Sequence, residues 1–300
     1  MNVPDPSRDI PYLFHTCMLQ IATEFKSNQS QRKFDLCNQL AAIIQESDKS
    51  LLSQIQPCSP SISTSSTSSS STSTEVSAAN WLPLLTSGLY DIFTSRLDKQ
   101  NRDSGFYLIA ALNEVFPRFN WMTIGTEGVT DTHCKNFFPL IGRLVCIEIC
   151  IELRKDEAID EHLLNACLMI FETFIDTLCT EEKLSQPASR LSPDSIVNLY
   201  NALRETILTV IDYVKNIIYD WESVQSNEKN FSIVMACVRV ICFWSLEDFK
   251  GIEDKVTDLI PFFNQLLKDE KSAKLVGHFI LASFEELFDG EETQNVQTTQ

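Results

Sequence analysis

The sequence contains little glycine and little positive charge. Only 8 of its 300 residues are Gly, and 24 Lys and Arg residues stand against 41 Asp and Glu, so the formal net charge is −17. Loops that cradle phosphates with backbone amides depend on glycine, and nucleic-acid binding draws its affinity from clustered Lys and Arg. These shortages argue against nucleotide-dependent catalysis and against nucleic acid as a partner.

The motifs of the common catalytic and metal-binding classes are also missing. The 4 His residues form no H-E-x-x-H pattern, and the sequence has no G-x-S-x-G, Walker-type or EF-hand motif. Cys146 and Cys150 stand one helical turn apart, but no further ligand at matching spacing completes a zinc site. His133 and Cys134 lack the surroundings of a cysteine protease, so a cysteine hydrolase is only a remote alternative. We predict no catalytic residue, no cofactor and no metal.

Signals for export or membrane insertion are absent from the sequence as well. Pro4, Pro6 and Asp9 stand where a signal peptide would need a basic cap and an apolar run. The most apolar stretches, 137–151 and 231–244, are short and contain charged residues. The 10 Cys residues include no C-x-x-C pair, which favours reduced thiols. We therefore expect a cytoplasmic protein with no membrane span.

Helical periodicity is what the sequence has in abundance. Apolar residues recur at intervals of three and four, and no strand pattern competes with them. One start is well marked, because Ser192 can cap a helix whose first positions are Pro193 and Asp194. Pro261 should split the helix in which it stands. The predicted helices are 10–26, 31–56, 80–98, 103–116, 135–155, 159–180, 193–221, 228–246, 252–268 and 271–288.

These ten helices predict an all-α fold of the armadillo or HEAT type, that is, an α-solenoid. The later helix starts pair into units of roughly 55–60 residues, somewhat above the usual range of such repeats. We expect the solenoid to occupy 10–288, with a flexible N-terminus at 1–9 and a disordered tail at 289–300. Between 61 and 74 every residue except Ile62 is Ser or Thr, so we predict a disordered insertion at 57–79.

Four tryptophans are candidate contact residues. Trp221 and Trp244 lie on apolar helical stripes and should belong to the core. Trp121 stands in the irregular connection 117–133, where it is a weak candidate for a partner-binding anchor. The alternative for Trp121 is a side chain folded back onto its own domain, as large aromatic residues usually are.

Several apolar segments, in the same order along the chain, resemble the neurochondrin family. They are GFYLIAALNEVF at 105–116 followed by FNW at 119–121, LVCIEICIEL at 144–153, LRETILTVIDY at 203–213, SIVMACVRVICFW at 232–244 and DLIPFF at 258–263. The resemblance covers about residues 10–288. We expect the chain to correspond to an internal portion of longer family members, lacking repeats at both ends.

The resemblance implies a non-catalytic cytoplasmic adaptor that binds receptor tails and signalling kinases and is associated with neurite outgrowth and dendrites. The membrane anchor attributed to N-terminal cysteines in the family is not expected here, because the first cysteine, Cys17, lies within a predicted helix. The negative charge favours partners with basic segments. The alternative is a structural helical-repeat subunit of a larger complex.

Overall fold

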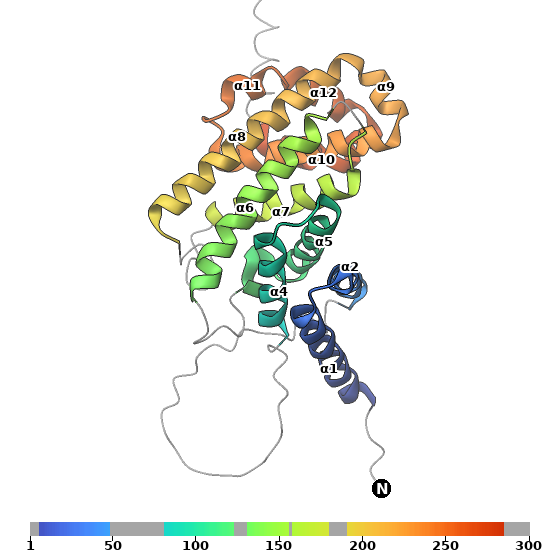
Figure 1. Ribbon diagram of the computed structural model, residues 1–300. Helices are drawn as coiled ribbons and strands as arrows, with labels where there is room; N and C mark the ends of the chain where they lie inside the picture. The colour runs from blue at the N-terminus through green and yellow to red at the C-terminus, as the bar shows by residue number, and fades with distance from the viewer. Residues whose placement is uncertain (1–5, 49–80, 123–130, 156–157, 180–190, 285–300) are drawn as a thin grey trace, which may run out of the picture. The chain divides into compact units, whose positions relative to one another are not determined.

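The computed structural model describes residues 6–48, 81–122, 131–155, 158–179 and 191–284 (Figure 1). Every regular element in these ranges is helical, which confirms the predicted all-α class. In chain order the elements are α1 (Pro6–Ser27), α2 (Gln31–Glu46), α4 (Leu82–Thr94), α5 (Lys99–Val115), the 3₁₀ segment η2 (Pro117–Met122), α6 (Asp131–Leu153), α7 (Glu161–Cys179), α8 (Pro193–Ile217), η4 (Ile218–Asp220), α9 (Trp221–Ser226), α10 (Glu228–Asp248), α11 (Glu253–Thr257), α12 (Ile260–Lys268), α13 (Glu270–Ser272) and the π-helical turn η5 (Ala273–Gly277). Helical structure continues after η5 through residues 278–284.

The helices form two compact units. Unit 1 comprises Met1–Leu140 with Glu182–Leu191, and unit 2 comprises Ile141–Glu181 with Ser192–Gln300. Helix α6 therefore contributes its first part to unit 1 and its second part to unit 2.

Unit 1 stacks one helix pair on another. Helix α1 packs on α4, and α2 packs on α5. The Trp81 indole donates to Nδ1 of His15 at 3.3 Å across a separation of 66 positions, and the Cys37 thiol donates to the Ser104 carbonyl across 67 positions. Since both contacts span nearly the same interval, the pair α4–α5 repeats the pair α1–α2.

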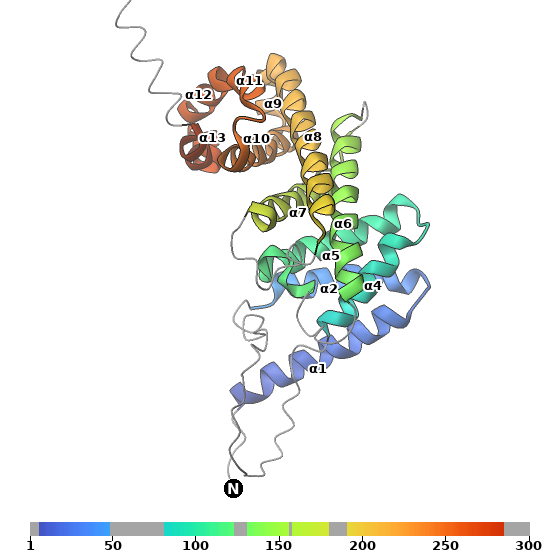
Figure 2. The same cartoon turned by 90° about the vertical axis from the view of Figure 1, so that its left-hand side faces the viewer.

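Unit 2 repeats a helix pair in the same way (Figures 1 and 2). Helix α7 packs on α10, and Arg239 donates to Glu172 at 2.7 Å across 67 positions. The next repeat is shorter. Lys215 and Asp258 join α8 to the segment after α11 across 43 positions, and the Ser283 hydroxyl donates to the Cys242 carbonyl across 41 positions.

These intervals refine the predicted repeat. Intervals of 41 and 43 positions fall within the armadillo and HEAT range of about 40–47 residues. The interval of 67 positions between α7 and α10 is longer because the connection before α8, the long helix α8 and the short helix α9 all lie within it. The sequence-based spacing of 55–60 residues is therefore an average of unequal repeats.

Local signals placed several helix boundaries correctly. The Ser192 side chain accepts from the Ser195 amide and Pro193 opens α8, as predicted. Pro261 stands in the first turn of α12, so the predicted helix at 252–268 is divided into α11 and α12. Proline favours this position because its missing N–H would have had no partner there.

Several boundaries differ from the prediction; α2, for example, ends at Glu46 and not at residue 56. Helix α1 begins at Pro6, so the last part of the expected flexible segment 1–9 is helical. Helix α5 begins one turn early, because Asp98 and not Asp103 caps it. Asp103 lies inside the helix and pairs with Lys99 at 2.9 Å. The predicted insertion at 57–79 and tail at 289–300 lie outside the described residues.

The close approach of α4 to α1 at Gly88 provides a test of how these two helices pack. A Cβ at Gly88 would stand 2.3 Å from Cε1 of Phe25, which is fully buried in α1. Gly88→Ala should therefore lower the free energy of unfolding by about 1–3 kcal/mol in urea titrations. Gly277→Ala is the matched control, because its nearest neighbouring atom is 3.5 Å away. Because alanine has the higher helix propensity, the control should leave the free energy of unfolding unchanged or raise it by up to about 1 kcal/mol. An equal decrease in the free energy of unfolding for both variants would contradict the close approach.

The His15–Trp81 hydrogen bond predicts a pH dependence. Burial lowers the pKa of His15 from its usual 6.5, and Nδ1 must be unprotonated to accept from Trp81. The folded state therefore binds fewer protons than the unfolded state, so this stability is present above about pH 6.5 and is lost as the pH falls through the lowered pKa. The urea midpoint should fall on acidification, and His15→Leu should flatten that slope. His278→Gln, which changes an exposed histidine in unit 2, should leave it intact; an unchanged slope in His15→Leu would refute the assignment.

Candidate functional site

The tryptophan singled out from the sequence is not exposed to a partner. Trp121 is 0% exposed, and its indole donates to Oδ1 of Asn113 at 2.7 Å. The short η2 segment in which it stands packs on α4 and α5 of unit 1. The alternative weighed for Trp121 is therefore the correct one. Trp221 and Trp244 are buried, as predicted.

Cys146 and Cys150 gain no metal-binding partner among the described residues. Cys146 is buried, which raises the pKa of its thiol to about 12, and the Cys150 thiol donates to the hydroxyls of Thr206 and Thr209. Within the described residues no group of three His, Cys, Asp or Glu side chains could hold a metal ion. The side chains of His133 and Cys134 lie outside the described part of the chain, so that remote alternative stays untested.

An open groove of about 1040 Å³ crosses three stacked helical segments of unit 2. Its walls come from the N-terminal parts of α7 and α10 and from the α13–η5 segment. Met169 and Leu275 stand at its surface, 43% and 49% exposed, above the buried side chains of Phe231 and Val276. We call this surface the α7–α10–η5 groove. Exposed apolar side chains above a buried apolar floor are typical of a surface that binds another molecule.

Charged side chains in the groove interact with other side chains of unit 2. Arg239 of α10 donates to Glu172 of α7 at 2.7 Å and also lies over the ring of Phe279 at 5.1 Å. Lys271 lies over the ring of Phe231 at 4.2 Å. Burial raises the pKa of Glu172, and the Arg239 guanidinium opposes that shift. The cations of the groove are thus largely engaged with side chains of unit 2 itself.

The π-helical turn explains why Leu275 faces outward. The sequence pattern places Leu275 and Phe279 on the buried stripe of this helix, but the structure buries Val276, Ile280 and Phe284 instead. A π-helical turn spans an extra residue, so it rotates the following side chains relative to a regular helix. Here η5 turns Leu275 out of the core and into the groove.

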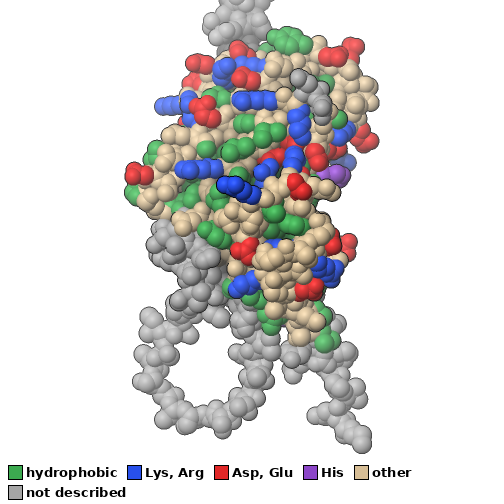
Figure 3. Space-filling view, viewed as in Figure 1, with side chains coloured by type: hydrophobic (Ala, Val, Ile, Leu, Met, Phe, Trp, Pro, Cys, Tyr) green, Lys and Arg blue, Asp and Glu red, His purple; other side chains and the backbone are tan. Residues whose placement is uncertain are grey.

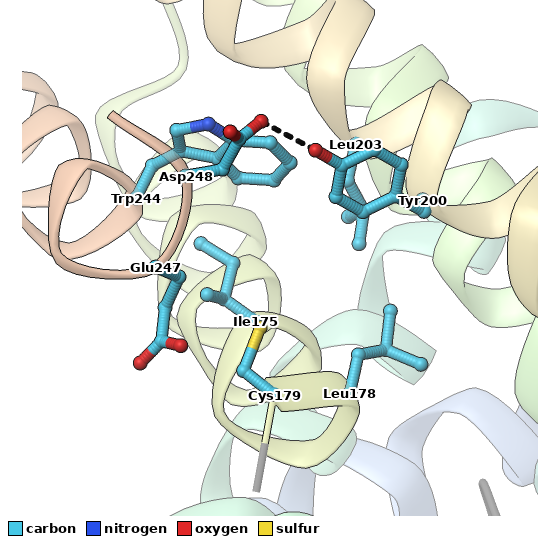
Figure 4. A pocket seen from close by; sticks show the side chains of 8 residues that line it. All are labelled: Ile175, Leu178, Cys179, Tyr200, Leu203, Trp244, Glu247 and Asp248. Atoms are coloured by element: carbon cyan, nitrogen blue, oxygen red, sulfur yellow. Dashed lines mark hydrogen bonds between the residues drawn. The ribbon is translucent and has the colours of Figure 1, made fainter. Parts of the chain in front are cut away.

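A second, smaller hollow lies where α7 and α10 end. Its volume is about 190 Å³, and its lining comes from α7, α8 and α10 (Figure 4): Ile175, Leu178, Cys179, Tyr200, Leu203, Trp244, Glu247 and Asp248. We call it the C-terminal pocket. Tyr200 donates to Asp248 across it, and the Tyr200 ring lies 5.6 Å from that of Trp244. The pocket combines an apolar and aromatic wall with two carboxylates.

Burial and the nearby carboxylates both raise the pKa values of Cys179 and Tyr200 in this pocket. The pKa of Cys179 is raised to about 12, first by burial and then by Glu247, Asp176 and Asp248. The pKa of Tyr200 is raised to about 12 by burial and by its hydrogen bond to Asp248. Both shifts report a site in which additional negative charge is disfavoured.

Helices α7 and α10, which line both hollows, have the length and hydropathy of membrane spans. More than half of each apolar window is buried against other helices, 56% in α7 and 61% in α10. This burial is what the core helices of a helical repeat require. On the face displayed in Figure 3, acidic, basic and hydrophobic side chains are interspersed.

Neither hollow was found from the sequence. Met169, Leu275, Glu247 and Asp248 belong to helices that the pattern predicts well, but nothing local shows that these helices run side by side. The only available signal was an apolar residue outside the main stripe, such as Met169. Such residues are common on protein surfaces and carry little information by themselves.

Comparison with known proteins supports the resemblance seen in the sequence. A sequence model of the neurochondrin family matches residues 7–275. The chain is similar to the neurochondrin homolog of Drosophila melanogaster, with 23% identity over 256 residues. The match covers 84% of this chain and 31% of that relative, so the chain spans about a third of the relative's length. No solved structure matches the chain significantly.

The raised pKa of Cys179 predicts an unusual thiol reactivity. Cys179 is exposed as a residue, but its thiol is partly desolvated beside Glu247, and the raised pKa leaves little thiolate at pH 8. It should therefore react with iodoacetamide more slowly than the exposed Cys17. Glu247→Gln removes the largest electrostatic cause of the shift and should speed alkylation of Cys179 several-fold. Mass spectrometry of the alkylated peptides measures both rates. An unchanged Cys179 rate in Glu247→Gln would show that Glu247 does not act on the thiol.

Proposed function

Because the chain belongs to the neurochondrin family, we propose that it is a non-catalytic scaffold that binds segments of other proteins in the α7–α10–η5 groove. The observation that carries the proposal is this groove, with Met169 and Leu275 exposed above an apolar floor. Stacked helix pairs form continuous surfaces of this kind, and repeat proteins use them to bind extended partners.

The proposed partners are cytoplasmic segments with basic character, such as receptor tails and regions of signalling kinases. The net charge of −17 supports basic partners because opposite charge accelerates encounter and selects against acidic segments. The family resemblance supports a cytoplasmic location and a role in neurite outgrowth and dendrites. Because the chain spans about a third of its relative, functions of the longer protein that need its other parts are not assigned to it.

A structural subunit of a larger complex is the second candidate, and one observation favours it. Ile147 and Ile151 of α6 are 53% and 46% exposed beside a hollow that Cys150 and Arg154 also line. A permanent partner would cover this patch. Size-exclusion chromatography separates the two functions, because a scaffold should elute as a stable monomer whereas an orphaned subunit should aggregate.

Substitutions in the groove test the proposed scaffold. Fluorescence anisotropy with labelled basic receptor-tail peptides should show binding that weakens at high salt. Leu275→Asp should weaken that binding about tenfold, because it places a charge on the apolar contact surface. Leu246→Asp is the matched control, since Leu246 is 54% exposed on α10 but lines neither hollow. Equal affinity of the two variants would exclude the groove as the binding surface.

A further inference from the structure

We propose that the C-terminal pocket holds the side chain of an arginine from the bound basic segment. This inference rests on the proposed scaffold function and names the chemistry that the scaffold would recognise. It is carried by the shape of the pocket, by the charge that lines it and by the end of α10 that lies there.

The size of the pocket fits one long side chain. Its volume of about 190 Å³ is below the ~300–1,000 Å³ of pockets for whole small molecules. The buried side chains of Ile175, Leu203 and Trp244 form its apolar wall, which suits the aliphatic stem of an arginine. Glu247 and Asp248 of α10 line the pocket as well, and Figure 4 shows the Asp248 carboxylate turned toward Tyr200, apart from that of Glu247.

A helix terminus adds to the negative potential of the pocket. Helix α10 ends at Asp248, which lines the pocket. The C-terminal end of a helix carries a partial negative charge that attracts cations. The pocket therefore joins two formal charges and one helix end of the same sign.

No cation of the described residues lines the pocket. The positive charge of Arg204 opposes the rise in the pKa of Tyr200. Its guanidinium, however, donates to the Gly251 carbonyl at 2.9 Å and does not line the pocket. Glu247 forms no ion pair within the described residues and instead contacts the Cys179 thiol. Among the described residues, the two carboxylates thus form no ion pair with a Lys or Arg side chain.

Asp248 is already held in position for a ligand. It accepts from the Tyr200 hydroxyl and from the Gly251 amide, the latter at 3.2 Å. A guanidinium offers five N–H donors in one plane, so it can pair with a carboxylate through two of them and lie against an aromatic side chain. An ammonium group is more strongly hydrated and lacks this planar arrangement, so we expect arginine to be preferred over lysine.

The test uses the full chain and a fluorescein-labelled peptide, Gly-Ser-Arg-Arg-Gly-Arg-Arg-Ser-Gly, with two matched peptides. One replaces every arginine by citrulline, which is neutral and nearly isosteric, and the other replaces every arginine by lysine. Binding is measured by anisotropy, and its location is read from methyl NMR shifts of Ile175, Leu178 and Leu203 in the pocket and of Leu275 in the groove. The arginine peptide should bind most tightly and move the pocket methyl signals.

Glu247 provides the variant and Glu222 its control. Glu247 lines the pocket, whereas Glu222 is an exposed glutamate on α9 of the same unit that does not line it. Glu247→Gln should weaken the arginine peptide about tenfold, and Glu247→Lys more, because a charge-assisted contact is lost and then replaced by repulsion. Glu222→Gln and Glu222→Lys give the same changes in net charge and should have little effect.

The possible outcomes separate this inference from the proposed function. Arginine-dependent shifts at the pocket methyl groups, lost in the Glu247 variants alone, would support it. Binding that moves only the Leu275 signal would overturn the pocket assignment and leave the scaffold function standing. Equal binding of the arginine and citrulline peptides, or equal losses in the Glu247 and Glu222 variants, would also overturn it. Absence of binding by all three peptides would contradict the basic-partner part of the proposed function itself.

Discussion

Burial of α10 among its neighbours is the interaction on which unit 2 depends. This helix packs against α7, α8, α9 and the η5 segment, and it contributes Phe231, Val234, Val238 and Trp244 to the core. Burying a side chain of this size contributes about 1.5–3 kcal/mol, so one helix supplies a large share of the unit's apolar stabilisation.

The parallel stacking of α7 and α10 also creates both candidate binding surfaces. Side chains 67 positions apart face each other along the pair, as Arg239 and Glu172 do. The N-terminal parts of the two helices form the α7–α10–η5 groove, and their ends form the C-terminal pocket. A basic segment could therefore use apolar contacts at one end of the helix pair and acidic contacts at the other.

Much of the fold could be predicted from local sequence. The helical stripes, the Ser192 cap and the break at Pro261 each depend on residues within one or two turns, so the sequence shows them directly. The cap at Asp98 was missed because Asp103, one turn later, has the same chemistry. The orientation of Leu275 was missed because a π-helical turn moved the buried face by one position, to Val276, which is apolar as well.

The sequence by itself determined the helical class, the position of most helices and the family, because apolar periodicity and the order of apolar segments are properties of the chain alone. It also determined the acidic charge that argues against nucleic acid. Only the tertiary structure decided that Trp121 is buried, that Met169 and Leu275 share a groove, and that Glu247 and Asp248 meet the end of α7. The physical reason is that a local pattern does not show which segments pack together. The groove and the pocket join residues tens of positions apart, and only the packing of complete helices brings them together.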